Sequence, residues 1–150
     1  MNRQIVWYIS FIFILSVAGF SCRKDDIISD DKNISLSFST DSVVFDTVFT
    51  SIGTVTKRLM VYNNSNKRIR ISDIRLAAGN NSVFRMNVDG VSGIQISDIE
   101  LAANDSLYVL VKATIDPRDE SNPYVVEDEL SFLTNGNNQT VKLVAWGQDA

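Results

Sequence analysis

Short segments in which apolar and polar residues alternate fill the chain from about residue 34 onward. The clearest runs from Leu107 to Ile115, where every second side chain is apolar. An alternation of period two is the pattern of a β-strand with one face in a core and the other in water. Such segments recur about every 8–12 residues between turn-forming clusters, a spacing typical of an antiparallel sandwich or barrel. After the N-terminal region, no segment shows convincing helical spacing.

Turn residues separate the expected strands. Asparagine, aspartate and glycine, which tolerate left-handed backbone conformations, gather at residues 63–66, 89–90 and 135–138. A change in the phase of the alternation predicts an irregularity at Ser72 and Asp73. We therefore expect an all-β chain, an immunoglobulin-like antiparallel β-sandwich of about seven to nine strands, preceded by an N-terminal signal helix.

The first 22 residues have the order of an export signal. Arg3 supplies a positive charge, and no charged residue follows until after Cys22. The centre is apolar, and small residues, among them Ala18 and Ser21, precede the cysteine. The apolar stretch is at the short edge of the about 20 residues that a membrane-spanning helix needs. On length alone, a cleaved signal peptide and a retained anchor helix are both open.

Cys22 is the chain's one cysteine, so it cannot form an internal disulfide. Its position after the small residues resembles the lipobox of bacterial lipoproteins, although Gly19 and Phe20 depart from the usual pattern. The resemblance implies cleavage before Cys22 and acylation of its thiol and its new amine, for example with palmitate. Several acyl chains hold a protein on a membrane more firmly than one. The alternative is an ordinary signal peptide or an uncut anchor with an incidental cysteine.

The acidic segment after the cysteine is expected to hold a folded domain away from the membrane. Within it, Lys24, Asp25 and Asp26 resemble the lysine-plus-acid signal that directs lipoproteins of the Bacteroides group to the cell surface. The alternative is that these residues form only a hydrophilic spacer. The expected parts of the chain are a signal peptide, an acidic tether and a sandwich domain, at residues 1–21, 22–33 and 34–150.

Composition excludes several classes of chemistry. With 14 basic and 18 acidic residues the chain has a net charge of −4, whereas nucleic-acid binding requires clustered positive charge. The absence of histidine removes the usual general base, the histidine-containing triads and most zinc or copper sites. An acylated Cys22 leaves no thiol nucleophile, and there is no glycine-rich phosphate loop. We expect no cofactor, no metal, no nucleic-acid partner and no enzymatic activity.

Carboxylates are the remaining catalytic candidates, because glycoside hydrolysis needs only two acids at a set separation. Six acids could supply such a pair: Asp116, Asp119, Glu120, Glu127, Asp128 and Glu129. The first three are also candidate ligands for calcium, a cation that takes about six to eight oxygen ligands. The preferred interpretation is a solvated loop and a sheet edge, where charge discourages edge-to-edge pairing.

Two further groups of residues could contact a partner. Tyr62, Tyr108 and Trp146 alternate away from the core and could stack on sugar rings; packing against a following domain or cover of a sheet edge is the alternative. Five basic residues are expected around one hairpin: Lys57, Arg58, Lys67, Arg68 and Arg70. They could contact anionic lipid or an acidic glycan, and the alternative is a soluble face exposed to water.

Three acid–hydroxyl–aliphatic triplets resemble the signal for O-glycosylation in Bacteroides. Ser42, Thr47 and Ser106 each follow an aspartate and precede a valine or leucine. Thr47 falls within an expected strand, so Ser42 and Ser106 are the preferred acceptors.

A series of short motifs runs in order along residues 35–147. In chain order they are Phe45-Asp46-Thr47-Val48, Gly53, Val61-Tyr62-Asn63-Asn64, Ile69-Arg70-Ile71, Phe84, Leu101 to Ser106, Asp116-Pro117 and Gly147. This series resembles the immunoglobulin-like modules of the ASPM/SPD-2/Hydin family, which also resemble major sperm protein. It is especially similar to the N-terminal module of Bacteroidetes surface lipoproteins, in which a larger domain often follows. The resemblance implies an adhesive or spacing role without a catalytic residue set, in a chain that is a fragmentary relative.

The sequence therefore predicts a lipid-anchored, non-enzymatic spacer or interaction module at the bacterial outer membrane. We expect it to be exposed at the cell surface, with an unidentified protein or glycan as its partner. The first alternative is a glycan-binding module of a polysaccharide-capture system. The second is a carboxylate-dependent glycoside hydrolase or an accessory to one.

Overall fold

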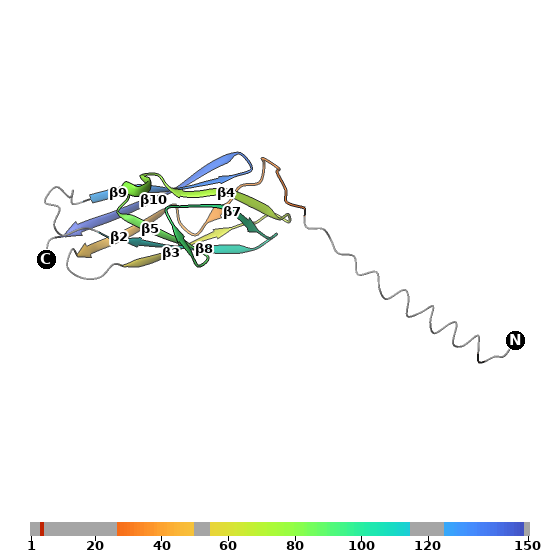
Figure 1. Cartoon of the computed structure of the whole chain (residues 1–150), viewed down its shortest axis with the longest axis horizontal. Coiled ribbons are helices and arrows are strands. Elements are labelled where there is room, and N and C mark those ends of the chain that lie inside the picture. Colours follow the sequence, from red (N-terminus) through yellow and green to blue (C-terminus); the bar gives the residue numbers. More distant parts are fainter. Residues whose placement is uncertain (1–3, 5–26, 50–54, 115–124, 149–150) are drawn as a thin grey trace.

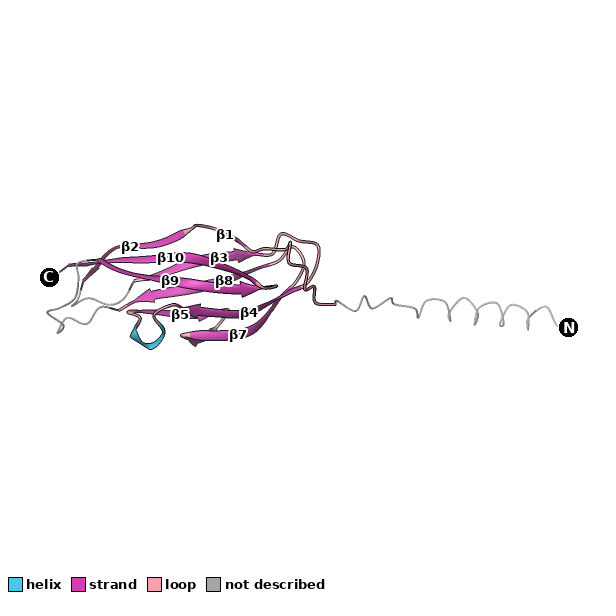
Figure 2. Ribbon diagram, turned by 90° about the horizontal axis from the view of Figure 1, so that it is seen from above, coloured by secondary structure: helices cyan, strands magenta, loops and turns pink. Residues whose placement is uncertain are grey.

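Two five-stranded β-sheets pack face to face (Figure 1, Figure 2). The computed structural model describes Gln4 and residues 27–49, 55–114 and 125–148. One sheet, called the β8 sheet, has the strand order β1-β3-β8-β5-β6, and the other, called the β9 sheet, has the order β2-β10-β9-β4-β7. The elements are β1 (Ser37–Phe38), β2 (Ser42–Phe49), β3 (Thr56–Tyr62), β4 (Ile69–Leu76), the 3₁₀ turn η1 (Gly79–Asn81), β5 (Phe84–Val88), β6 (Val91–Gly93), β7 (Gln95–Leu101), β8 (Ser106–Ala113), β9 (Val125–Thr134) and β10 (Asn137–Gln148).

The strand pairs are antiparallel, except that β2 runs parallel to β10. The expected all-β, immunoglobulin-like antiparallel sandwich is therefore confirmed. Two very short strands, β1 and β6, bring the total among the described residues to ten. The described residues contain no helix long and apolar enough to cross a membrane. Apart from Gln4, the expected signal helix lies outside them.

The core lies between the sheets and is formed by the inward half of each alternation. In β8 every second side chain is buried, as the sequence predicted. Two aromatic contacts join one sheet to the other. The ring centroids of Phe38 and Phe132 are 4.9 Å apart, and those of Phe45 and Phe84 are 5.7 Å apart. Because burying one large apolar side chain contributes about 1.5–3 kcal/mol, these rings are major contributors to holding the two layers together.

Two-residue turns close two hairpins where the sequence predicted turns. Asp89 and Gly90 have φ angles of 47° and 93°, and Asn135 and Gly136 have φ angles of 50° and 80°. Positive φ at both central residues is the type I′ geometry, which matches the twist of the flanking strands. Asparagine, aspartate and glycine at these positions therefore set the register of both hairpins.

The predicted irregularity in β4 is also present. The register of β4 against β9 shifts between Ile71 and Asp73. Asp73 lies on the same side of β4 as Arg75 and is only 8% exposed, and its carboxylate has three partners, one of them the Ser97 hydroxyl at 3.4 Å. Gln95 Nε2 donates to it at 2.8 Å, and Arg75 Nε lies 3.2 Å away. A charged group is tolerated at this depth because it is paired and hydrogen-bonded.

Amide side chains of β10 hold the segment through which the chain enters the sandwich. Asn137 Nδ2 donates to the carbonyl oxygen of Lys32 at 2.7 Å. The Gln139 side chain exchanges two hydrogen bonds of 2.9 Å with the backbone of Leu36. The segment that the sequence assigns to the end of the tether therefore contacts the folded domain.

Asp31 adds an electrostatic contact to this entry segment. The backbone N–H of Asn33, which donates to Asp31 Oδ1 at 3.0 Å, holds the pKa of the Asp31 carboxyl below its ordinary value. Lys67 Nζ, 3.6 Å from Asp31 Oδ2, acts in the same direction. The stabilisation is complete above the ordinary pKa of aspartate and is lost as the pH falls through the lowered value.

Asn63 closes the end of the sandwich at which the chain passes from β3 to β4 in the other sheet. Its side chain is fully buried. Nδ2 donates to the carbonyl oxygens of Lys67 and Ala102, each at 2.8 Å, and Oδ1 accepts from the N–H and hydroxyl of Ser65. One carboxamide thus joins the β3–β4 connection to the β7–β8 connection. The burial is sustained because each polar atom of the amide has a partner.

We expect Asn63→Ala to lower the free energy of unfolding by about 2–3 kcal/mol, because it leaves buried carbonyl groups without a donor. The matched control is Asn64→Ala, which removes one exposed hydrogen bond to Ser37 Oγ and should cost no more than about 0.5 kcal/mol. Chemical denaturation followed by circular dichroism measures both. Equal losses for the two variants would contradict the role assigned to Asn63.

Candidate functional site

Seven of the sequence-predicted site residues lie outside the described residues, and their roles stay predictions. These are Cys22, Lys24, Asp25, Asp26, Asp116, Asp119 and Glu120. The part of the chain that the structure does describe contains no group of three or more His, Cys, Asp or Glu side chains placed to hold a metal ion.

Two of the three predicted glycosylation acceptors lie at the first residue of a strand. Ser42 begins β2, and its hydroxyl donates to Asp41 Oδ1 at 3.1 Å. Ser106 begins β8, and its backbone N–H donates to Asp105 Oδ1 at 2.8 Å. Thr47 lies within β2, as expected. Modification at these positions stays a prediction.

The three acids of β9 have two different environments. Glu127 and Glu129 are exposed and, with Lys142, line a shallow depression of about 330 Å³. Asp128, between them, turns toward the β4–β5 connection. Its Oδ1 accepts the backbone N–H of Ala78 at 3.0 Å, and its Oδ2 accepts the Ser82 hydroxyl. Asp128 therefore holds a loop in place, which gives this carboxylate a structural use.

The basic residues expected around one hairpin are separated, so that prediction was wrong. β3 and β4 belong to different sheets. Lys57 and Arg58 lie at the start of β3, while the other three lie around its far end and the start of β4. There, Arg68 and Arg70 are each 3.4 Å from Glu100, which offsets part of their charge.

An apolar patch, called the Trp146 patch, lies on the outer face of the β9 sheet. It consists of Val44, Val125, Val144 and Trp146. Val44 lies opposite Val144 in the parallel pair, and Trp146 lies opposite Val125 in the antiparallel pair. Trp146 is 48% exposed and Val44 is 39% exposed. The predicted outward orientation of Trp146 is confirmed, and the cross-strand pairing adds three valines to it.

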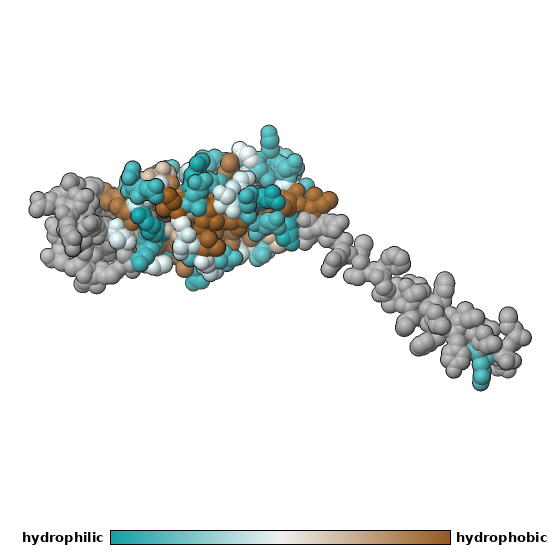
Figure 3. All heavy atoms as spheres, in the orientation of Figure 1, coloured by the Kyte–Doolittle hydropathy of each residue, from teal (hydrophilic) through white to brown (hydrophobic). Residues whose placement is uncertain are grey.

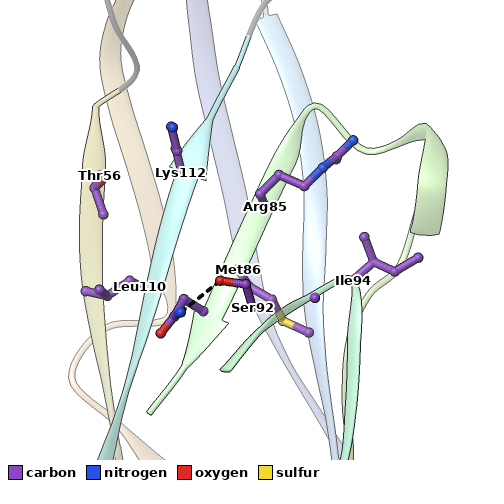
Figure 4. A pocket seen from close by; sticks show the side chains of 9 residues that line it. Thr56, Arg85, Met86, Ser92, Ile94, Leu110 and Lys112 are labelled. Atoms are coloured by element: carbon purple, nitrogen blue, oxygen red, sulfur yellow. Dashed lines mark hydrogen bonds between the residues drawn. The ribbon is translucent and has the colours of Figure 1, made fainter. Parts of the chain in front are cut away.

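A groove of about 570 Å³, called the Lys112 groove, lies on the outer face of the other sheet. Its lining residues are Thr56, Arg85, Met86, Asn87, Ser92, Gly93, Ile94, Leu110 and Lys112. In Figure 4, Arg85 and Lys112 project from adjacent strands at one end, and Leu110 and Ser92 lie further along. The register explains this grouping, because Lys112 lies between Thr56 of β3 and Arg85 of β5.

Hydrogen bonds fix two of the polar groups in the Lys112 groove. Asn87 Nδ2 donates to Ser92 Oγ at 2.9 Å (Figure 4). Arg85 Nη1 donates to the carbonyl oxygens of Ser82 and Phe84, so the guanidinium is held at the rim. No acidic side chain lines the groove. The sequence did not predict this groove. Its one indication in the sequence is that Arg85 and Lys112 fall at outward positions of their strands.

Both surfaces lie toward the end of the sandwich that is remote from the entry segment. Residues 31–36 approach at one end, whereas β2 and β10 end, and β3 begins, at the other (Figure 1). Figure 3 shows apolar residues in an interrupted band along the long axis, with hydrophilic residues on both sides. The visible face is thus mixed in character rather than uniformly apolar.

No sequence-family model and no curated protein matches the chain. Solved structures do match it. The ASH/PapD-like domain 7 of human CEP192 is 10% identical, with a TM-score of 0.55 over 85% of this chain and 93% of that domain. A chain of the Salmonella enterica SafA pilin–SafB chaperone complex is 15% identical, with a TM-score of 0.50 over 81% of this chain and 59% of that one. The fold is PapD-like.

This PapD-like sandwich agrees with the immunoglobulin-like fold that the sequence resemblance implied, while the assignment to a Bacteroidetes lipoprotein module stays a prediction. A family 123 glycoside hydrolase from Clostridium perfringens also matches, at 5% identity and a TM-score of 0.50. That match covers 78% of this chain but 28% of the enzyme. Identities this low show the fold alone.

We expect Asp128→Ala to lower the free energy of unfolding by about 2 kcal/mol, because it removes a charged acceptor from the Ala78 N–H and the Ser82 hydroxyl. Glu127→Ala, on the exposed phase of the same strand, is the matched control and should change stability by about 0.5 kcal/mol or less. Urea denaturation distinguishes them. A neutral Asp128→Ala variant would refute the structural use of this carboxylate.

Proposed function

We propose that the protein is a lipid-anchored, non-enzymatic interaction module of the bacterial outer membrane, exposed at the cell surface, whose sandwich binds a partner protein. The observation that carries the proposal is the polarity of the domain. The entry segment is fixed at one end, and both candidate surfaces lie toward the other (Figure 1). The chain therefore enters the domain at one end, and the surfaces that could bind a partner lie toward the opposite end.

The entry segment is attached to the domain by hydrogen bonds, and this attachment places the entry point of the chain at one end. Lys32 and Leu36 are hydrogen-bonded to side chains of β10, so residues 32–36 are held at one end of the domain. A strand of twelve residues such as β10 extends about 40 Å. An anchor at Cys22 would then present the Trp146 patch and the Lys112 groove well above the membrane.

The environment of the described acids supports a non-enzymatic role. Asp128 is occupied by a loop, and Glu127 and Glu129 lie on an open face beside Lys142. A glycoside hydrolase holds the scissile bond of the sugar in a site between two carboxylates. An exposed strand surface does not supply such a site.

Metabolic labelling with radioactive palmitate tests the anchor. We expect the wild-type chain to be labelled and Cys22→Ala to be unlabelled and absent from the membrane fraction, because the acylated thiol is lost. Lys24→Ala is the companion variant. It should keep its label but lose accessibility to protease added to whole cells if residues 24–26 direct surface export. Undiminished labelling of Cys22→Ala would overturn the anchor.

A glycan-binding module is the second candidate function, and the Trp146 patch favours it. Exposed aromatic rings stack on the apolar faces of sugars, and Trp146 is exposed. Val144 and Lys142 precede it on the same face of β10, and Glu127 lies opposite Val144 on β9. A polar rim around an aromatic anchor is the usual form of a small binding site.

Affinity electrophoresis in gels that contain neutral or acidic polysaccharides tests this candidate. If the patch binds glycan, migration of the wild-type chain slows, and Trp146→Ala abolishes the effect while Tyr108→Ala, on the opposite sheet, does not. Unretarded migration of the wild-type chain in every gel would exclude glycan binding and leave the protein-interaction module standing.

A further inference from the structure

The outward strand positions of the β8 sheet carry positive charge without any carboxylate, and a neighbouring acid, exposed Asp89 of the β5–β6 turn, donates its backbone N–H to the carbonyl oxygen of Tyr108. The sheet's outward positions on the five strands are Ser37, Thr56, Arg58, Met60, Tyr62, Arg85, Asn87, Ser92, Ser106, Tyr108, Leu110 and Lys112. Three of these side chains are basic and none is acidic, in a chain that has 18 acidic and 14 basic residues. The outer face of the β9 sheet differs, because Glu100, Glu127 and Glu129 lie on it.

The cations of this face have no acidic partner in the described part of the chain. The ion pairs found there involve Lys67, Arg68, Arg70 and Arg75, all outside the β8 sheet. Lys112 is exposed on the outer face of the central strand, and Arg85 on its neighbour has two backbone carbonyls as partners. An anionic ligand would supply the missing complement.

Along β8 itself the outward side chains change from charged to apolar, while Arg58 of β3 and Asn87 of β5 lie on either side of Leu110. Lys112 lies between Thr56 and Arg85, and Leu110 is the next outward residue of the same strand. Tyr108 follows, opposite Met60. Outward residues of one strand are about 6.6–6.8 Å apart, which is also the spacing of alternate side chains in an extended peptide. A peptide laid along β8 can therefore match these rows one by one.

We propose that the Lys112 groove binds an extended acidic segment of the partner protein, with a carboxylate at Lys112 and apolar side chains over Leu110 and Tyr108. The inference rests on the proposed function as a protein-interaction module and names the chemistry of the partner. The expected sequence is an acidic residue, any residue, an apolar residue, any residue and a second apolar residue. Affinity comes from partly exposed charge pairs and modest apolar burial, so binding is weak and sensitive to salt.

The geometry favours a peptide over the other anionic polymers. The residues that line the groove include no aromatic side chain, and Tyr108 lies beyond them on β8, so a sugar chain seated in the groove itself would have no ring to stack on. The cationic end lies away from the entry segment, so a headgroup of the anchoring membrane is the wrong source of negative charge (Figure 1). Leu110 and Tyr108 can pack against aliphatic side chains, which a peptide supplies.

Fluorescence anisotropy with the full-length lipidated chain in detergent micelles tests the proposal. The probe is a dye-labelled peptide with the repeating order Glu-Ser-Val-Ser-Val-Ser. We expect it to bind, and Lys112→Gln to weaken binding about three- to fivefold, the worth of one partly exposed charge pair. The matched control is Lys142→Gln, an exposed lysine on the outer face of the other sheet, which should leave binding unchanged.

A charge exchange keeps the test independent of folding. Lys112→Glu should lose the Glu-Ser-Val-Ser-Val-Ser peptide and bind the corresponding Lys-Ser-Val-Ser-Val-Ser peptide. Equal binding to wild-type and Lys112→Gln chains, or no binding at all, overturns the groove assignment. Binding of polygalacturonate or of anionic vesicles in place of the peptide overturns the choice of a protein segment. None of these failures alters palmitate labelling or protease accessibility, by which the anchored surface module is judged separately.

Discussion

The buried carboxamide of Asn63 is the contact on which the arrangement of the two sheets depends. Strand ladders satisfy the backbone within each sheet, but they supply nothing where the chain crosses between sheets. At one end two crossings meet, and Asn63 donates to a carbonyl oxygen in each. Its own backbone N–H donates to Asp105 at 2.9 Å, next to the start of β8. The backbone of the same residue therefore closes the end of the β3–β8 ladder, next to the crossings that its side chain joins.

The path of the chain through β1 and β2 explains the one parallel strand pair of the described residues. β1 pairs with β3, and the chain then changes sheets, so that β2 continues in the same direction beside β10. This continuity explains why β2 and β10 form the parallel pair. It also brings the start of β2 beside the second half of β10, where Val44 and Trp146 belong to one patch. The chain that follows the entry segment thus builds part of the surface at the remote end of the domain.

Local pattern predicted most of the strands and the outward side chains, but it could not predict which strands are neighbours. The alternation placed Tyr62, Tyr108 and Trp146 on outer faces, and the turn chemistry of Asn135 and Gly136 set a hairpin. The connection at residues 63–68 looks the same in sequence whether it closes a hairpin or spans the about 10 Å between packed sheets. That ambiguity produced the wrong grouping of the basic residues. The Lys112 groove needs both neighbours of β8, which are contacts of long sequence separation.

The two outer faces differ in charge, and the reason begins with the inner faces, whose composition is constrained. Both inner faces must be apolar to form the core, so differences in recognition can arise only outside. Arg58, Arg85 and Lys112 lie on three adjacent strands of one outer face, where like charges repel and stability gains nothing from their proximity. Nearby carboxylates would relieve that repulsion, and the chain places them on the other sheet. A stability requirement alone does not account for this separation of charge, whereas the acidic peptide proposed for the Lys112 groove would account for it.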